Sequence, residues 1–106
     1  MENTFRIGRF EELALRAVWH LGEKAYGIPI RQEIADRTGR EYSVGAIYTA
    51  LDRLEQKGFV TSRLGDPTPE RGGRAKKYFR IEADGIRALN NSQDMVAAMG
   101  GLIHVG

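Results

Sequence analysis

The chain has 106 residues, of which 42% are hydrophobic and 28% charged, and its formal net charge is +2 at pH 7. This length suits one domain with room for an accessory helix, and the complete lack of cysteine excludes disulfides and thiolate metal sites and fits a reducing compartment. The N-terminal residues lack the apolar run of a secretory signal, and no stretch approaches the roughly 20 apolar residues of a membrane span, so we expect a cytoplasmic protein without a membrane partner.

Positive charge is concentrated in one part of the chain. Residues 57–81 contain 7 basic and 2 acidic side chains. By contrast, residues 1–56 contain 8 basic and 9 acidic side chains, and residues 82–106 contain 1 basic and 3 acidic side chains. Such a concentration of cations predicts a polyanion as partner.

Residues 1–9 show no periodic pattern, and we expect them to form a loose arm. Apolar residues then recur at helical spacing and predict an amphipathic helix over 10–21, with Phe10, Leu13, Ala14, Ala17, Val18 and Leu21 on its apolar stripe. Leu15 and Trp19 widen this stripe to one side. A stripe this wide predicts that the helix packs both on its own core and on a partner.

A second helix is predicted over 29–38, after a short loop. Pro29 suits the first turn of a helix, Ile30 and Ile34 supply a buried side, and Gly39 ends the helix. Another turn of about four residues leads to a third helix. Two helices joined in this way match the helix-turn-helix pattern, in which the second helix reads a DNA groove.

The third helix is predicted over 43–58, with Ser43 as its N-cap and Gly58 just past its end. Its apolar face consists of Val44, Ile47, Tyr48, Leu51 and Leu54. We expect the four aliphatic residues in the core, while Tyr48 is open to two roles: packing in the core, or contacting a phosphate through its hydroxyl. The other face starts with small residues, which permit the close approach that a DNA-reading helix needs.

A β-hairpin is predicted next, because residues 59–64 and 76–81 are rich in β-formers and residues 65–74 are rich in turn formers. Three helices followed by a hairpin form a winged helix. The predicted fold class is therefore mainly α with a small β-hairpin. A last helix is predicted from residue 83 to beyond Met99, stopped by Gly100 and Gly101, and an apolar tail follows.

The third helix and the hairpin carry the candidate DNA-binding residues: Ser43, Gly45, Ala46, Tyr48, Thr49, Arg53, Arg71, Gly72, Gly73, Arg74, Lys76 and Lys77. Small residues at the helix tip suit the major groove, and glycines between cations suit a wing near the minor groove. Because side chains alternate along a strand, Lys76 and Lys77 face opposite ways, so not every cation faces one ligand. For the wing, the alternative is a solvated charged hairpin. For the whole chain, the alternative is a winged helix that serves as a protein-interaction module without specific DNA binding.

Catalytic and metal-binding patterns are lacking. His20 and His104 lie in different predicted elements. Neither Glu11-Glu12 nor the pair Asp66 and Glu70 has further residues at the spacing of metal ligands or of a general acid and base. We therefore expect no enzymatic activity, no cofactor and no metal ion.

Five pieces of the sequence together resemble the PadR family of bacterial transcription regulators over about residues 10–90. They are Tyr26-Gly27-Ile28-Pro29-Ile30, Ser43-Val44-Gly45-Ala46-Ile47-Tyr48, Leu51-Asp52-Arg53-Leu54-Glu55-Gln56-Lys57-Gly58, Arg71-Gly72-Gly73-Arg74-Ala75-Lys76-Lys77-Tyr78-Phe79-Arg80-Ile81 and Asp84-Gly85. Each piece is weak alone, and their order and spacing make the resemblance specific.

The resemblance implies a homodimeric repressor of the short type, in which a single C-terminal helix packs against the first helix of the partner. It divides the chain into a DNA-binding domain, 10–82, and a dimerisation helix and tail, 83–106. The implied interface residues are Phe10, Leu13, Ala17, Trp19, Ile86, Leu89, Val96 and Met99.

Some members of the PadR family bind flat aromatic or cationic compounds in the dimer interface, sometimes against a tryptophan of the C-terminal helix. This sequence departs from that pattern, because its single tryptophan is Trp19 in the first predicted helix and the last predicted helix has no aromatic residue. The drug-binding pore of those members is therefore not carried over to this chain. A small-molecule effector, of unknown identity, would have Trp19 as its candidate aromatic wall.

Overall fold

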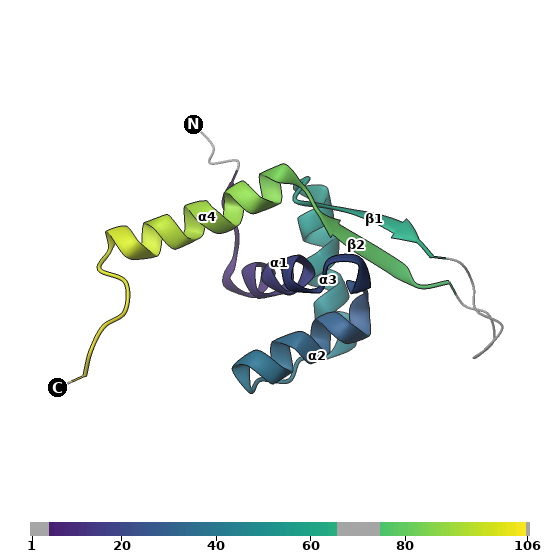
Figure 1. Ribbon diagram of the computed structural model, residues 1–106, viewed down its shortest axis with the longest axis horizontal. Helices are drawn as coiled ribbons and strands as arrows, with labels where there is room; N and C mark the ends of the chain where they lie inside the picture. Colours follow the sequence, from purple (N-terminus) through teal and green to yellow (C-terminus); the bar gives the residue numbers. More distant parts are fainter. Residues whose placement is uncertain (1–4, 66–74, 106) are drawn as a thin grey trace.

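The computed structural model describes residues 5–65 and 75–105. Within these residues, four α-helices, a short 3-10 helix and a two-stranded antiparallel sheet form a winged helix with one further helix (Figure 1). The elements are α1 (Arg9–Leu21), η1 (Gly22–Lys24), α2 (Gly27–Thr38), α3 (Val44–Gln56), β1 (Val60–Leu64), β2 (Lys77–Ile81) and α4 (Ala83–Ala98). The predicted fold class is confirmed.

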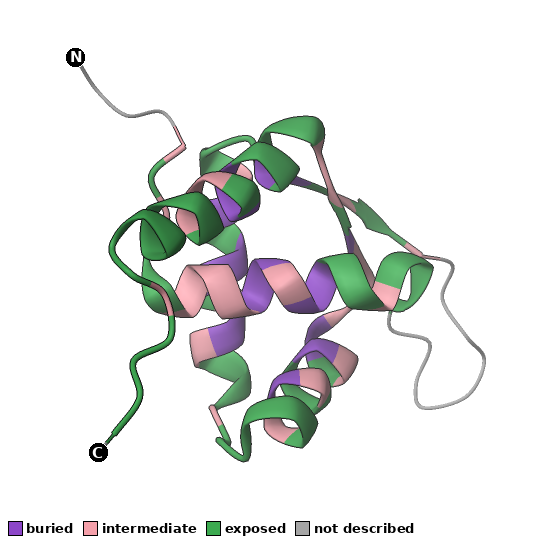
Figure 2. Ribbon diagram, turned by 60° about the vertical axis from the view of Figure 1, so that its left-hand side comes forward, coloured by how far each residue is buried: buried purple, intermediate pink, exposed green. Residues whose placement is uncertain are grey.

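The core surrounds α1, whose buried face crosses the middle of the molecule in Figure 2. Its members, all at most 7% exposed, are Ala14, Leu15, Ala17, Val18, Ala25, Ile30, Ile34, Ile47, Ala50, Leu51, Leu54, Phe59, Val60, Phe79, Ala88 and Leu89. Burying each large aliphatic or aromatic side chain stabilises the fold by about 1.5–3 kcal/mol. This core fixes α3 and the hairpin relative to each other.

The helix α2 starts at Gly27, two residues before the predicted start. Its first ladder bond runs from the Ile30 N–H to the Tyr26 carbonyl at 3.0 Å, which makes Pro29 the third residue of the helix instead of the first. Pro29 is tolerated there because the N–H groups of a first turn have no partner within the helix. Gly39 ends α2 in the left-handed conformation, as predicted.

Both ends of α3 are confirmed. The Ser43 hydroxyl accepts the Ala46 N–H at 3.1 Å, and Gly58 has a φ of 78° just past the helix. The prediction that Val44 lies in the core is wrong, because Val44 is 37% exposed. It occupies the first turn, ahead of the part of α3 that packs on the core, and Ala50 is buried one turn after Ile47 instead.

The hairpin pairs Val60 with Ile81 and Leu64 with Lys77. On its other edge, β2 is fastened to the turn before α2, because the Phe79 N–H donates to the Ala25 carbonyl at 2.8 Å and Tyr26 bridges Tyr78. The strand β2 is therefore held by β1 on one edge and by residues 25–26 on the other. Most of the predicted tip, with the candidates Arg71, Gly72, Gly73 and Arg74, lies outside the described residues.

The helix α4 ends at Ala98, so the prediction of a helix continuing past Met99 is wrong. The predicted glycines do stop it. The Gly100 N–H donates to the Ala97 carbonyl at 3.1 Å and the Gly101 N–H to the Val96 carbonyl at 2.9 Å, the bonding pattern of a Schellman motif. Figure 1 shows the distal half of α4 projecting away from the other helices.

Residues 5–8 are not the loose arm that the sequence predicts. Phe5 and Ile7 pack, partly buried, against the core, and the Lys57 ammonium donates to the Arg6 carbonyl at 3.3 Å. The described part of the N-terminal segment is thereby tied to the C-terminal end of α3.

Candidate nucleic-acid interface

One face of α3 is free of the core, and its residues are exposed. Gly45, Thr49, Asp52 and Gln56 recur there at intervals of four, three and four residues, opposite the buried face. The Thr49 hydroxyl donates to the Gly45 carbonyl at 3.0 Å, which leaves its methyl group free to point outward. We call these four residues the α3 ridge. The ridge contains two of the predicted DNA-binding residues, Gly45 and Thr49, at its start.

On one flank of the ridge, the largely buried carboxylate of Glu11 lies near two cationic side chains. The Lys57 ammonium lies 2.6 Å from one carboxylate oxygen of Glu11, and the Arg53 guanidinium lies 4.0 Å from the other. The Gly8 N–H also donates to this carboxylate at 3.3 Å. Arg53, a predicted DNA-binding residue, is thus directed toward α1 while its guanidinium stays exposed.

The environment of Glu11 shifts its pKa. Burial raises the pKa of Glu11, but the hydrogen bonds from Lys57 and Gly8 and the charges of Lys57 and Arg53 outweigh this effect and leave the pKa below its ordinary value. Glu11 is therefore a stable anion that neutralises part of the charge at this end of α3. Sequence patterns cannot show this link, because Glu11 and Lys57 are 46 residues apart.

Tyr48 lies on the opposite flank of α3, half-buried against the core. Its hydroxyl approaches Gly27 so closely that a β-carbon at Gly27 would be 2.5 Å away from it. The ring therefore packs as one of its two predicted roles requires. The hydroxyl itself is held at the N-terminus of α2, where backbone N–H groups favour anions.

The two lysines of the wing face different neighbours, as strand alternation predicts. Lys77 is half-buried and its ammonium lies 3.7 Å from the Glu55 carboxylate of α3. Lys76 is exposed on the other face, where its ammonium lies 4.6 Å from the centre of the Tyr26 ring. Of the two, only Lys76 offers a cation that no carboxylate of the described residues neutralises.

The outward face of the wing also contains residues that were not among the predicted DNA-binding residues. Arg63 lies over the Tyr78 ring at 4.9 Å, and the Tyr26 and Tyr78 rings meet edge to face at 5.3 Å. Alternation along β1 could have placed Arg63 on this face. The position of Tyr26 could not be inferred in that way, because Tyr26 joins the sheet through an isolated bridge.

The predicted dimer residues divide into exposed and buried groups. Trp19, Ile86, Val96 and Met99 are exposed, whereas Phe10 and Leu13 are half-buried. Ala17 and Leu89 are 2% and 7% exposed and belong to the core of the chain itself. Their burial leaves them almost no surface for a partner, so they are removed from the predicted interface.

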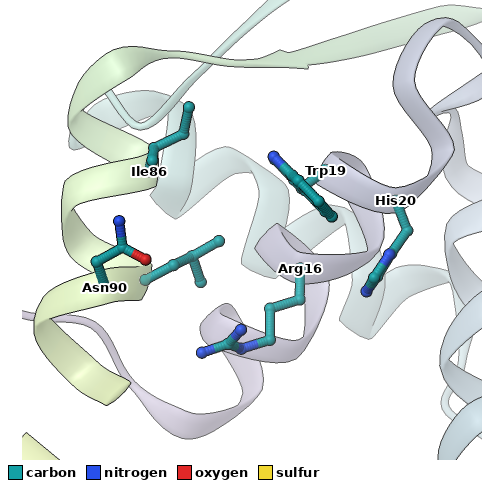
Figure 3. A pocket seen from close by; sticks show the side chains of 6 residues that line it. Arg16, Trp19, His20, Ile86 and Asn90 are labelled. Carbon is teal, nitrogen blue, oxygen red and sulfur yellow. The ribbon is translucent and has the colours of Figure 1, made fainter. Parts of the chain in front are cut away.

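Trp19 borders a pocket of about 340 Å³ between α1 and α4. In Figure 3, Arg16, Trp19 and His20 extend from α1 and face Ile86 and Asn90 of α4 across it. The Trp19 and His20 rings meet edge to face at 5.2 Å. The pocket thus combines an aromatic wall with polar groups, a combination typical of small-molecule sites.

Comparisons with known proteins agree with this architecture. The profile of the family described as "Transcriptional regulator PadR-like family" matches residues 18–91. A protein of Lysinibacillus sphaericus called "Uncharacterized protein X" is 32% identical over 85 residues, which cover 78% of this chain and 73% of that protein.

Solved structures show the same fold. A PadR family transcription regulator from Clostridium difficile R20291 superimposes with a TM-score of 0.71 at 21% identity, covering 87% of this chain and 91% of that one. A PadR family transcriptional regulator from Eggerthella lenta gives a TM-score of 0.67 at 25% identity, covering 86% and 77%. In residues 5–65 and 75–105, no helix has both the length and the apolar character needed to cross a membrane. The chain belongs to the PadR-like family of transcriptional regulators.

Proposed function

We propose that this protein is a homodimeric repressor that binds operator DNA through the α3 ridge and the wing and is released by a small molecule. The observation that carries this proposal is the α3 ridge itself. Its first half is built of Gly45 and Thr49, flanked by Ala46, so α3 presents little bulk where it would enter the major groove. The wing adds exposed cations, among them Arg63 and Lys76.

Phosphate contacts would come from groups around the ridge. The Tyr48 hydroxyl at the start of α2, the Lys76 ammonium and the Arg53 guanidinium are the described candidates. Such contacts set the position and orientation of a protein on the duplex without reading its sequence. Arg71, Gly72, Gly73 and Arg74 would extend this contact toward the minor groove.

The spacing of residues along α4 supports self-association. Gly85, Leu89, Ser92, Val96 and Met99 follow one another at intervals of four, three, four and three residues, and so lie on one face of the helix. The first part of this face is buried, with Gly85 close to the Phe59 carbonyl and the Ile81 side chain. Further along it, the Ser92 hydroxyl donates to Glu12 of α1 at 2.6 Å. Val96 and Met99 continue the same face and are exposed to solvent in the single chain. A second copy would cover them and place two α3 helices on half-sites roughly 34 Å apart.

The pocket beside Trp19 supports release by a small molecule. It lies between α1 and α4, the two helices that the proposed dimer brings together, and its volume of about 340 Å³ falls in the range of ligand sites. A ligand there would have to bind the dimer geometry that does not fit DNA more tightly than the one that does. Trp19 is the only tryptophan of the chain, so its fluorescence reports binding directly.

The proposal is tested by measuring binding to duplexes from the region upstream of its own coding sequence over a range of salt concentrations. Binding that weakens steeply with salt and prefers one site over random DNA is expected. Loss of that complex on adding a compound that quenches Trp19 would establish release. If no duplex is bound even at low salt, the winged helix acts as a protein-interaction module and the proposal fails.

A further inference from the structure

The α3 ridge carries one charge, and it is negative. Asp52 is exposed and lies in the middle of the ridge, between Thr49 and Gln56. A carboxylate is unexpected on a surface proposed to face DNA, because the phosphates of the duplex repel it. A hydrogen-bond donor in the groove would offset this repulsion.

The other charged side chains of α3 and its C-cap have partners in neighbouring elements. The Arg53 guanidinium and the Lys57 ammonium lie 4.0 and 2.6 Å from the Glu11 carboxylate of α1. Glu55 turns to the wing, where it lies 3.7 Å from the Lys77 ammonium and accepts the Ser62 hydroxyl at 2.6 Å. Among the described residues, Asp52 has neither a hydrogen bond nor an ion pair. Its carboxylate is free to meet an external donor.

The chemistry of the major groove restricts what that donor can be. Among the base edges there, only the amino groups of cytosine and adenine donate hydrogen bonds. Adenine places the acceptor N7 next to its amino group, and that lone pair repels a carboxylate. Cytosine presents its N4 amino group alone, so it is the base that a carboxylate accepts best.

We infer that Asp52 is a specificity-determining residue that selects a cytosine in each half-site of the operator. The inference rests on the proposed binding of DNA by α3. The carboxylate discourages contact with any sequence that lacks a donor at that position, and the hydrogen bond from cytosine N4 compensates for the repulsion in the right sequence. Asp52 thereby lowers affinity for random DNA while it favours the operator.

The test is selection of bound sequences from a randomised duplex library by the full chain, Asp52→Asn and a matched control. Asp36→Asn is the control: Asp36 is exposed on α2 and accepts the Gln32 side-chain amide at 2.8 Å, a role the asparagine oxygen can keep, and the change in net charge is the same. The wild type is expected to enrich one C·G pair per half-site. Asp52→Asn should shift that position to A·T, because an asparagine side chain pairs with adenine N6 and N7.

The preference at that position should change by roughly 5- to 150-fold, the usual effect of one base mismatch, while Asp36→Asn keeps the wild-type preference. Enrichment of the same bases by the wild type and Asp52→Asn at every position would overturn the role of Asp52 and leave the proposed DNA binding intact. A wild type that enriches no sequence and retains no duplex at low salt would overturn both.

Discussion

The Tyr48 side chain of α3 packs directly against Gly27, the first residue of α2. A β-carbon at Gly27 would lie 2.5 Å from the Tyr48 hydroxyl and within 2.9 Å of the ring. This contact locks the start of α2 to one flank of the α3 ridge. It therefore couples the stability of the helix-turn-helix to the placement of the hydroxyl proposed to contact a phosphate.

Gly27→Ala is expected to destabilise the protein by about 1–3 kcal/mol, because the added methyl group forces Tyr48 out of its site. The measurement is the free energy of unfolding from urea denaturation. Gly45→Ala is the matched control, since the nearest side-chain atom to a β-carbon there is 4.0 Å away. In an open helical position, alanine should stabilise by about 0.5–1 kcal/mol. Equal changes in the two variants would contradict the close packing at Gly27.

Tyr48→Phe separates the ring from the hydroxyl. The ring packs in both forms, so the free energy of unfolding is expected to change little. Affinity for duplex DNA is expected to fall about fivefold for all sequences alike, which corresponds to one lost hydrogen bond of about 1 kcal/mol. Titration of labelled operator and random duplexes measures both. An unchanged affinity would leave Tyr48 with its packing role alone.

The ion pairs of Glu11 with Lys57 and Arg53 predict that the stability of the fold depends on pH. The pKa of Glu11 in the folded chain is below its ordinary value of 4.5, so the stabilisation is complete above pH 4.5 and is lost as the pH falls through the folded pKa. Glu11→Gln should therefore be less stable than the wild type at pH 7, by less than about 1 kcal/mol because Lys57 is partly exposed. The two proteins should converge at acidic pH.

Urea denaturation at pH 7, 5, 4 and 3 would follow this convergence. Glu23→Gln serves as the control, since Glu23 is exposed on η1 and has no hydrogen bond or ion pair among the described residues. A constant difference between wild type and Glu11→Gln across this range would show that Glu11 acts through packing and not through its charge.

The two wing lysines should differ in their effect on salt dependence. Lys76→Ala is expected to weaken binding to all duplexes and to flatten the plot of log affinity against log salt by about one unit of slope, as loss of one phosphate contact does. Lys77→Ala should change the slope less, because Glu55 already lies 3.7 Å from the Lys77 ammonium. The same slope for both variants would mean that the Glu55 contact does not persist on DNA. Arg74→Ala is expected to act like Lys76→Ala.

Self-association through α4 can be tested with two neighbouring substitutions. Val96→Asp places a charge on the bare apolar face of α4, and we expect it to shift the protein toward monomer in sedimentation experiments. Ala97→Asp puts the same charge on the next exposed residue, about 100° around the helix, and should leave the dimer intact. A wild type that sediments as a monomer at all concentrations would contradict the dimer itself.

The elements of this fold follow largely from local sequence. Helical spacing of apolar residues predicted α1 and α3 to within a residue. Ser43 caps the start of α3, and Gly39 and Gly58 follow the ends of α2 and α3, as predicted. These features are accurate because a cap or an amphipathic period depends on residues at most a few positions apart. The predicted start of α2 was two residues late, because proline is allowed at more than one position of a first turn and Pro29 does not fix which one it occupies.

Local sequence patterns are enough to identify the residues that can form a winged helix with a basic wing, because periodicity, caps and charge are properties of neighbouring residues. Long-range packing, in contrast, determines that Val44 is exposed, that Tyr48 packs on Gly27 and that Asp52 on the α3 ridge has no hydrogen bond or ion pair within residues 5–65 and 75–105. Those outcomes depend on which distant segments meet, as Glu11 and Lys57 do across 46 residues. Contacts of that kind arise when the core closes around α1, and no local pattern encodes them.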